Sequence, residues 1–196
     1  MESYSYQDQG ERKKVLSSVK RVVIKVGTQL LQGGKNTTSE KRIEELVVAL
    51  ANLKKQGFEI ILVSSGAVGF GMAALQTSVR PKKIAYLQAL AAVGQSHLMS
   101  CYGAACEKHG FHCAQLLLTA ADLHNQVRNR HVAQCVNALL ENDVLPIINE
   151  NDSVCVDEIR VGDNDTLAAY VATMLRADLT VILTKVDGML YCKAGE

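Results

Sequence analysis

The alternation of short apolar runs with helix-like segments is the feature that most constrains the fold of this 196-residue chain. Each run is short enough for one strand and uninterrupted enough to be buried on both faces, which is typical of parallel sheets. Alternation of this kind predicts an α/β fold, with a mostly parallel sheet and helices on both faces in a three-layer sandwich. The runs are 21–27 (RVVIKVG), 59–65 (EIILVSS), 113–119 (CAQLLLT), 144–148 (VLPII) and 179–184 (LTVILT).

Two long helical patterns separate the first three strands. The segment 37–57 opens with TTSE, in which Thr37 and Glu40 have the spacing of a capping box. A second pattern covers 82–108, and we expect a break in it near Gly94. Its uncharged part contains glutamine, serine and histidine, so a buried helix is a better interpretation than a membrane span.

The second half of the chain continues the alternation. Residues 128–141 predict a helix, and residues 154–161 predict a small hairpin. The residues GDND at 162–165 introduce a further helix, with Asp163 or Asn164 expected as its N-cap. Residues 1–19 are polar, and we expect this extension to become ordered near Val19.

Composition excludes several classes of protein. Apolar residues make up 48% of the chain and the formal net charge is +1, so a sizeable core is expected and no charge excess suggests nucleic acid or a membrane as partner. The six cysteines form no C-x-x-C pair or zinc spacing, which favours reduced cysteines, a cytoplasmic location and no protein-held metal.

Polar and glycine-rich segments follow the predicted strands where ligands bind in α/β folds, beyond the carboxyl ends of the strands. Lys25 precedes the turn at Gly27 and could hold phosphate oxygens, although a lysine extending from an edge strand would look the same. The residues SSGA at 64–67 enter a helix whose backbone N–H groups could receive an anion, or they form only a tight turn. No Walker A or nucleophile-elbow spacing is present.

The stretch 145–170 is the richest in oxygen atoms, with six carboxylates and three asparagines after a buried strand. Its spacing does not match a calcium loop. Solvation alone does not explain Asn149 and Asn151 beside carboxylates. Carboxylates can bind an ammonium group, and neighbouring amides can hydrogen-bond to other polar groups of a ligand. This combination suits a small zwitterion such as an amino acid.

These motifs together resemble glutamate 5-kinase of the amino-acid kinase superfamily, from about Val22 to the end of the chain. The resemblance rests on the order VVIKVGTQLL, ILVSSGAVGFG, LAAVGQSHLM, QLLLT, PIINENDSV and VGDNDTLAA. It implies ATP-dependent phosphorylation of the γ-carboxylate of L-glutamate, the first step of proline synthesis. It also implies Mg²⁺ with ATP, proline as a feedback inhibitor and a homo-oligomer.

The resemblance also implies roles for individual residues. Lys25 would be the catalytic, phosphate-binding lysine, and Ser65, Asp152 and Asn164 would bind glutamate. The supporting glutamate-binding residues would be Gly66, Ala67, Asn149 and Asp165. The residues near the nucleotide would be Lys25, Gly27, Thr28, Thr184 and Lys185.

Two features separate this chain from the family pattern. Lys185 stands where glutamate 5-kinases usually carry aspartate, and the family's kinase domain continues past Glu196. We therefore expect residues 20–196 to be a kinase domain incomplete at its C-terminus, able to recognise the amino acid but weak as a kinase alone. Two alternatives remain open at this point. One is a silent relative that binds glutamate or proline, and the other is the kinase part of a bifunctional pyrroline-5-carboxylate synthetase.

Overall fold

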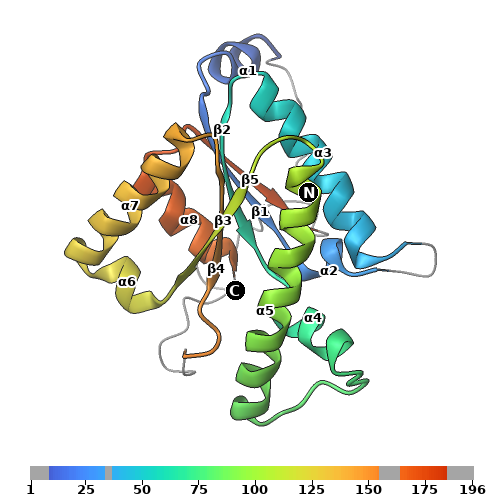
Figure 1. Ribbon diagram of the computed structural model, residues 1–196. Coiled ribbons are helices and arrows are strands. Elements are labelled where there is room, and N and C mark those ends of the chain that lie inside the picture. Colours follow the sequence, from blue (N-terminus) through green and yellow to red (C-terminus); the bar gives the residue numbers. More distant parts are fainter. Residues whose placement is uncertain (1–8, 34–36, 155–163, 185–196) are drawn as a thin grey trace, which may run out of the picture.

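A five-stranded parallel sheet in the order β3-β4-β2-β1-β5 forms the centre of the molecule in the computed structural model, which describes residues 9–33, 37–154 and 164–184 (Figure 1). Every strand pair in it is parallel, as predicted. The strands are β1 (Arg21–Val26), β2 (Glu59–Ser64), β3 (Cys113–Leu118), β4 (Leu145–Glu150) and β5 (Leu179–Leu183). The helices are α1 (Gln9–Leu16), α2 (Thr28–Leu31), α3 (Ser39–Lys55), α4 (Ala67–Ala74), α5 (Ile84–Glu107), α6 (Ala120–His124), α7 (Gln126–Glu141) and α8 (Asn164–Leu175).

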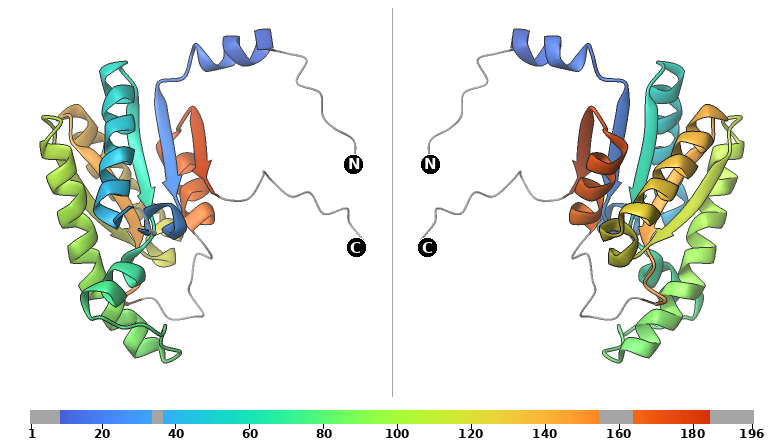
Figure 2. Two further views of the ribbon diagram at one scale, coloured as in Figure 1. Left: turned by 90° about the vertical axis from the view of Figure 1, so that its right-hand side faces the viewer. Right: turned by 90° about the vertical axis from the view of Figure 1, so that its left-hand side faces the viewer.

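Helices cover both faces of the sheet, which confirms the three-layer prediction. In Figure 1, α3 and α5 lie on the right of the strands, and α6, α7 and α8 lie on the left. The side views of Figure 2 show α5 on one side of the molecule and α8 with β5 on the other. Each layer has its own core of buried side chains, one built on α3 and α5 and the other on α6, α7 and α8.

The pleat of the strands decides which layer each side chain enters, because successive residues point to opposite faces. In β1, Val22 and Ile24 pack in the core of α3 and α5, whereas Val23 packs in the core of α8. Lys25 has the parity of Val23 and so faces α8. In β4, Asn149 has the parity of Ile147 and faces α5.

Two helix boundaries differ from the sequence predictions. The N-cap of α3 is Thr38, whose Oγ1 accepts a hydrogen bond from the Lys41 N–H, so the capping box predicted from Thr37 and Glu40 is wrong by one residue. At the other end of the chain, α8 begins at Asn164, which is therefore a helical residue and not the cap. Asp163, the other predicted cap, lies outside the described residues.

Two further expectations about order along the chain are also corrected. Order begins before Val19, because residues Gln9–Leu16 form α1. The strand predicted at 144–148 runs instead over Leu145–Glu150, so its last residues belong to the polar stretch. The predicted hairpin lies outside the described residues, apart from Val154.

The predicted break at Gly94 does not occur, because α5 is continuous from Ile84 to Glu107. Gly94 instead lets α4 cross α5 at very short range. A Cβ on Gly94 would lie 1.8 Å from the Ala67 carbonyl oxygen, and a Cβ on Gly71 would lie 1.9 Å from the Leu90 carbonyl oxygen. The two glycines therefore position α4, and the turn that precedes it, against α5.

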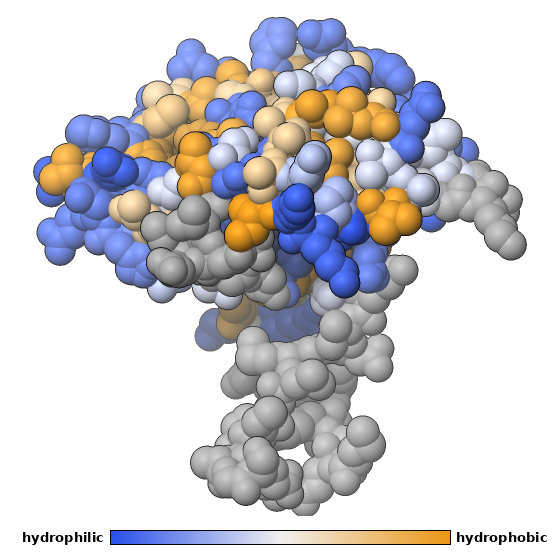
Figure 3. Space-filling view, turned by 90° about the horizontal axis from the view of Figure 1, so that it is seen from below, coloured by the Kyte–Doolittle hydropathy of each residue, from blue (hydrophilic) through white to orange (hydrophobic). Residues whose placement is uncertain are grey.

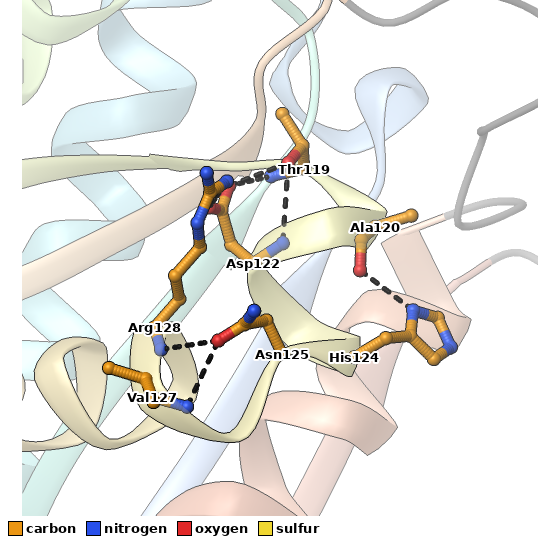
Figure 4. A network of polar contacts seen from close by, with 7 residues as sticks. All are labelled: Thr119, Ala120, Asp122, His124, Asn125, Val127 and Arg128. Carbon is orange, nitrogen blue, oxygen red and sulfur yellow. Dashed lines mark hydrogen bonds and ion pairs between the residues drawn. The ribbon is translucent and has the colours of Figure 1, made fainter.

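The connection from β3 to α7 is a capped corner that the sequence did not predict (Figure 4). Thr119 and Asp122 form a reciprocal capping box at the start of α6, and Asn125 caps α7 through the N–H groups of Val127 and Arg128. Partial burial raises the pKa of Asp122, but hydrogen bonds from Thr119 and Arg128 outweigh it and hold that pKa below its ordinary value.

The lower end of the molecule in Figure 1 is seen face-on in Figure 3, where apolar residues form separate patches among hydrophilic ones. Within the described residues, no helix is long and apolar enough to cross a membrane. The four cysteines in those ranges, Cys101, Cys106, Cys113 and Cys135, are free.

Candidate functional site

Lys25 lies buried near the carboxyl end of β1 and reaches Asp165 of α8. Its Nζ is 2.5 Å from Asp165 Oδ1. A Cβ on Gly27 would lie 3.5 Å from that Nζ and 3.7 Å from the Leu183 carbonyl oxygen, so Gly27 leaves the approach to the ammonium group uncovered. Phosphate oxygens could reach a positive charge at this point.

The turn between β2 and α4 depends on Gly66, which adopts φ 113° in the left-handed region where a side chain would be strained. Gly66 is also the N-cap of α4 and has no side chain, so the N–H groups of the first turn of α4 receive no side-chain cap from it. The turn is tied to the neighbouring strand by the Ser65 N–H, which donates to the Val26 carbonyl at 3.1 Å. Such a helix start can receive an anion.

A buried hydroxyl pair supports this turn from the α5 side. Ser64 Oγ donates to the Ser65 carbonyl at 3.2 Å and shares a 2.9 Å hydrogen bond with the Tyr102 hydroxyl. Tyr102 is fully buried, and burial raises its pKa far above the ordinary value. The hydroxyl therefore remains protonated and available as a donor.

Four polar side chains from four different elements form a continuous chain of hydrogen bonds, here called the amide chain. Asn149 Nδ2 donates to Gln95 Oε1 at 3.1 Å, and Asn164 Nδ2 donates to Asn149 Oδ1 at 3.1 Å and to Ser65 Oγ at 2.6 Å. Gln95 and Asn149 are buried, at 8% and 2% exposure. The amide chain joins α5, β4, the start of α8 and the turn before α4.

A cavity of about 340 Å³ opens beside the amide chain, at the carboxyl ends of β2 and β4. Its wall combines the uncapped start of α4 with carboxylates, amides and a small apolar end. The lining residues are Thr28, Gln32, Ser65, Gly66, Ala67, Val68, Gly69, Met72, Arg80, Ile84, Leu87, Gln88, Asn149, Glu150, Asp152 and Asn164.

The wall of the cavity carries charges of both signs. Glu150 and Asp152 contribute carboxylates, and Arg80 contributes a guanidinium group from the α4–α5 loop. Among the described residues, no group of three or more His, Cys, Asp or Glu side chains could hold a metal ion. With carboxylates and a guanidinium group in its lining, the cavity suits an organic ligand with charges of both signs.

The structure brings most of the sequence-predicted residues to one edge of the sheet. Ser65, Gly66, Ala67, Asn149, Asp152, Asn164 and Thr28 line the cavity. Lys25, Gly27 and Asp165 form the adjacent cluster at the end of β1, and Thr184 directly follows β5. Lys185 lies outside the described residues.

Sequence reasoning missed several residues that the structure places at the site. Gln95 belongs to the motif AAVGQ, which contributed to the family resemblance. Nothing in the sequence showed that its side chain would contact Asn149. Arg80 lies in a loop without a motif, so nothing in the sequence around it indicated a place at the cavity.

Residues 20–195 match the family described as "Amino acid kinase family". The chain belongs to this family. Among its curated relatives, "Glutamate 5-kinase" from Clostridium tetani is 44% identical over 184 residues, which cover 94% of this chain and 69% of the relative. "Glutamate 5-kinase" from Thermobifida fusca is 44% identical over 92% of this chain and 46% of the relative. The sequence thus places the chain with the glutamate 5-kinases, and it spans less than half of the longer ones.

Among solved structures, "Structure of Giardia Carbamate Kinase" matches with a TM-score of 0.59 and 20% sequence identity. The match covers 86% of this chain and 74% of the other. This similarity supports the same fold.

Proposed function

We propose that the protein catalyses ATP-dependent phosphorylation of the γ-carboxylate of L-glutamate, giving L-glutamyl 5-phosphate. The observation that carries this proposal is the placement of an amino-acid-sized cavity, with charges of both signs, directly beside the Lys25–Asp165 cluster. The similarity to glutamate 5-kinases supports the choice of substrate and the assignment to proline biosynthesis.

On the amino-acid side, the carboxylate of Asp152 takes the substrate ammonium group. The γ-carboxylate accepts hydrogen bonds from the Ser65 hydroxyl and the first N–H groups of α4, where the helix dipole favours an anion. Arg80, which also lines the cavity, takes the α-carboxylate through its guanidinium group. The ammonium group and the α-carboxylate of glutamate then each have a partner of opposite charge, and the γ-carboxylate has hydrogen-bond donors at a helix start.

The chemistry needs no general base in this arrangement. A glutamate side chain has an ordinary pKa near 4.3, so the nucleophilic carboxylate is already ionised at neutral pH. The barrier that remains is alignment of two anions and their mutual repulsion, and Lys25 lowers that repulsion at the transferred phosphoryl group. Asp165 holds the ammonium group of Lys25 in place.

Thr28, Thr184 and Lys185 would lie on the nucleotide side, with Gly27 leaving room for phosphate oxygens. Among the residues that the structure describes, the carboxylate placed beside Lys25 is Asp165, and it pairs with that lysine. Mg²⁺ held mainly by the nucleotide phosphates and water fits this donor set. When bound, the metal would neutralise charge on the phosphates. Feedback inhibition by proline, a homo-oligomeric state and a cytoplasmic location remain part of the proposal.

Glutamate- and ATP-dependent formation of glutamyl hydroxamate tests the reaction. We expect hydroxamate with L-glutamate and ATP together, and none when either is left out. Glutamate binding without any transfer, in a chain that includes whatever residues follow Glu196, would favour the silent amino-acid-binding relative instead.

A further inference from the structure

The buried amide of Gln95 has no assigned role in recognition or catalysis, although it makes the first hydrogen bond of the amide chain. We propose that Gln95 is a positioning residue: it accepts from the buried NH₂ group of Asn149 and so holds in place the hydrogen bonds from Asn149 to Ser65, through which Ser65 meets the ligand as a donor. This inference rests on the proposed function, because it concerns how the same cavity recognises its amino acid.

Two backbone groups identify the oxygen and the nitrogen of each asparagine amide. The Glu150 N–H lies 2.9 Å from one atom of the Asn149 amide, which must therefore be the acceptor Oδ1. The Ser64 carbonyl lies 3.2 Å from one atom of the Asn164 amide, which must be the donor Nδ2. The two hydrogens of this NH₂ group are shared among three oxygens, of which Ser65 Oγ is the nearest at 2.6 Å. These assignments do not depend on each other, and they agree, because Asn164 Nδ2 then donates to Asn149 Oδ1.

Gln95 completes this pattern at the buried end. The Nδ2 group of Asn149 is a donor and needs an acceptor, and Gln95 Oε1 supplies it at 3.1 Å. Asn149 is 2% exposed, so without Gln95 its NH₂ group would be left without a partner away from water. The Asn149 side chain would then rotate, and Asn164 would lose the oxygen that holds it.

The consequence reaches the cavity at Ser65. Because Ser65 Oγ accepts from Asn164 Nδ2 at 2.6 Å, its own hydrogen is directed elsewhere. That hydrogen has no acceptor among residues 9–33, 37–154 and 164–184, so the hydroxyl can donate it to a ligand carboxylate in the cavity that Ser65 lines. The amide hydrogens of Asn164 are already engaged, which leaves Oδ1 as the atom that Asn164 can offer to a ligand N–H.

Gln95→Met tests the proposal, since methionine has a similar length and no acceptor oxygen. We expect the dissociation constant for L-glutamate to rise about tenfold in calorimetry, the loss of roughly one buried hydrogen bond, while that for an ATP analogue changes less than about twofold. Gln95→Glu keeps an acceptor at the same position, and we expect it to retain most of the affinity.

Two controls separate positioning from general damage. Gln134→Met makes the same change on an exposed face of α7 and should leave glutamate binding unchanged. Leu98→Ala removes a fully buried side chain of α5, so it should lower the melting temperature and leave glutamate affinity close to normal.

A wild-type measurement covers the case in which Gln95→Met does not fold. The Asn149 side-chain NH₂ should exchange slowly with solvent and show NMR cross-peaks to Gln95, and rapid exchange would overturn the proposal. Unchanged glutamate affinity in a folded Gln95→Met chain would also overturn it and leave the proposed function standing. If the wild-type chain binds no glutamate, the proposed function itself fails.

Discussion

The amide chain and the Lys25–Asp165 pair lie at the same edge of the sheet, but they are held in different ways. The amide chain joins four elements through directional hydrogen bonds, and its Gln95 and Asn149 are almost completely buried. The Lys25–Asp165 pair is an ion pair between β1 and α8, and the Asp165 side chain is 37% exposed. If the cavity binds an amino acid, as proposed, its recognition needs fixed donors and acceptors. The transfer of a phosphoryl group needs instead a positive charge that the phosphate oxygens can approach.

Lys25→Ala should have the largest effect, and it should act on the phosphate side alone. Loss of one charge contact in the transition state lowers the rate on the order of 10²–10³-fold. Glutamate affinity should stay near normal, because the amide chain does not include Lys25. The rate of hydroxamate formation checks the first expectation, and calorimetric titration with glutamate checks the second. Lys41→Ala, which makes the same change at an exposed position, is the control. Near-normal turnover of Lys25→Ala would show that the two sides are not divided in this way.

Gly94→Ala should break the amino-acid side by moving α4. The added Cβ would lie 1.8 Å from the Ala67 backbone oxygen, so the helices must separate, at a cost of about 3 kcal/mol in the free energy of unfolding. Gly103→Ala on the same helix has nothing within 4 Å of its Cβ and should be neutral or slightly stabilising. Chemical denaturation of both variants provides the measurement, and equal stability would contradict the close crossing.

Asp152→Asn should weaken glutamate binding far more than ATP binding. The substrate ammonium group would lose its charged partner, at a cost of roughly 1.5–3 kcal/mol. Calorimetric titration with each ligand measures both effects in one preparation. An equal loss of affinity for ATP would mean that Asp152 acts on the phosphate side, and the two regions would then not be divided as proposed.

Arg80→Gln removes one positive charge from the cavity wall and so tests whether Arg80 binds the α-carboxylate. Arg80 is exposed at the cavity wall, so we expect only about a fivefold loss of affinity, or about 1 kcal/mol. The preference for glutamate over 4-aminobutyrate, which lacks the α-carboxylate, should fall by the same factor. Lys82→Gln, a neighbouring exposed residue that does not line the cavity, is the control. An unchanged preference would remove Arg80 from the α-carboxylate.

The smallest effect concerns the capped corner, which belongs to neither side of the site. The pKa of Asp122 is lowered in the folded chain, so its contribution to stability is present above the unfolded pKa near 4 and is lost as the pH falls through the folded value. Asp122→Asn should therefore destabilise the chain by about 1 kcal/mol at pH 7 and by less near pH 3. Denaturation at both pH values tests this, and glutamate affinity at pH 7 should not change.

Local patterns were enough to predict the strands and the polar edge, because a buried strand and the glycines and acids after it are adjacent in the chain. The predictions for Lys25 and the turn at Gly66 came from such local signals, although their functional roles stay predictions. The strand order could not be obtained, since it depends on packing between distant segments.

Gly94 and Gln95 show why the remaining features were missed. A glycine within a helical pattern predicts a break when only the helix is considered, and the close approach of α4 that favours it is a tertiary contact. Similarly, a glutamine on a buried helix indicates no partner until the pleat of β4 brings Asn149 to face it. Thr38 and Thr37 are equally good caps by residue type, so the cap of α3 could not be chosen by sequence.

A crystal structure of the chain with L-glutamate would test the central claim most directly. The account predicts glutamate in the cavity, with its ammonium group within about 3.2 Å of the Asp152 carboxylate and its γ-carboxylate accepting from Ser65 on the side nearer Lys25. Glutamate bound in the reverse direction, or outside this cavity, would contradict it.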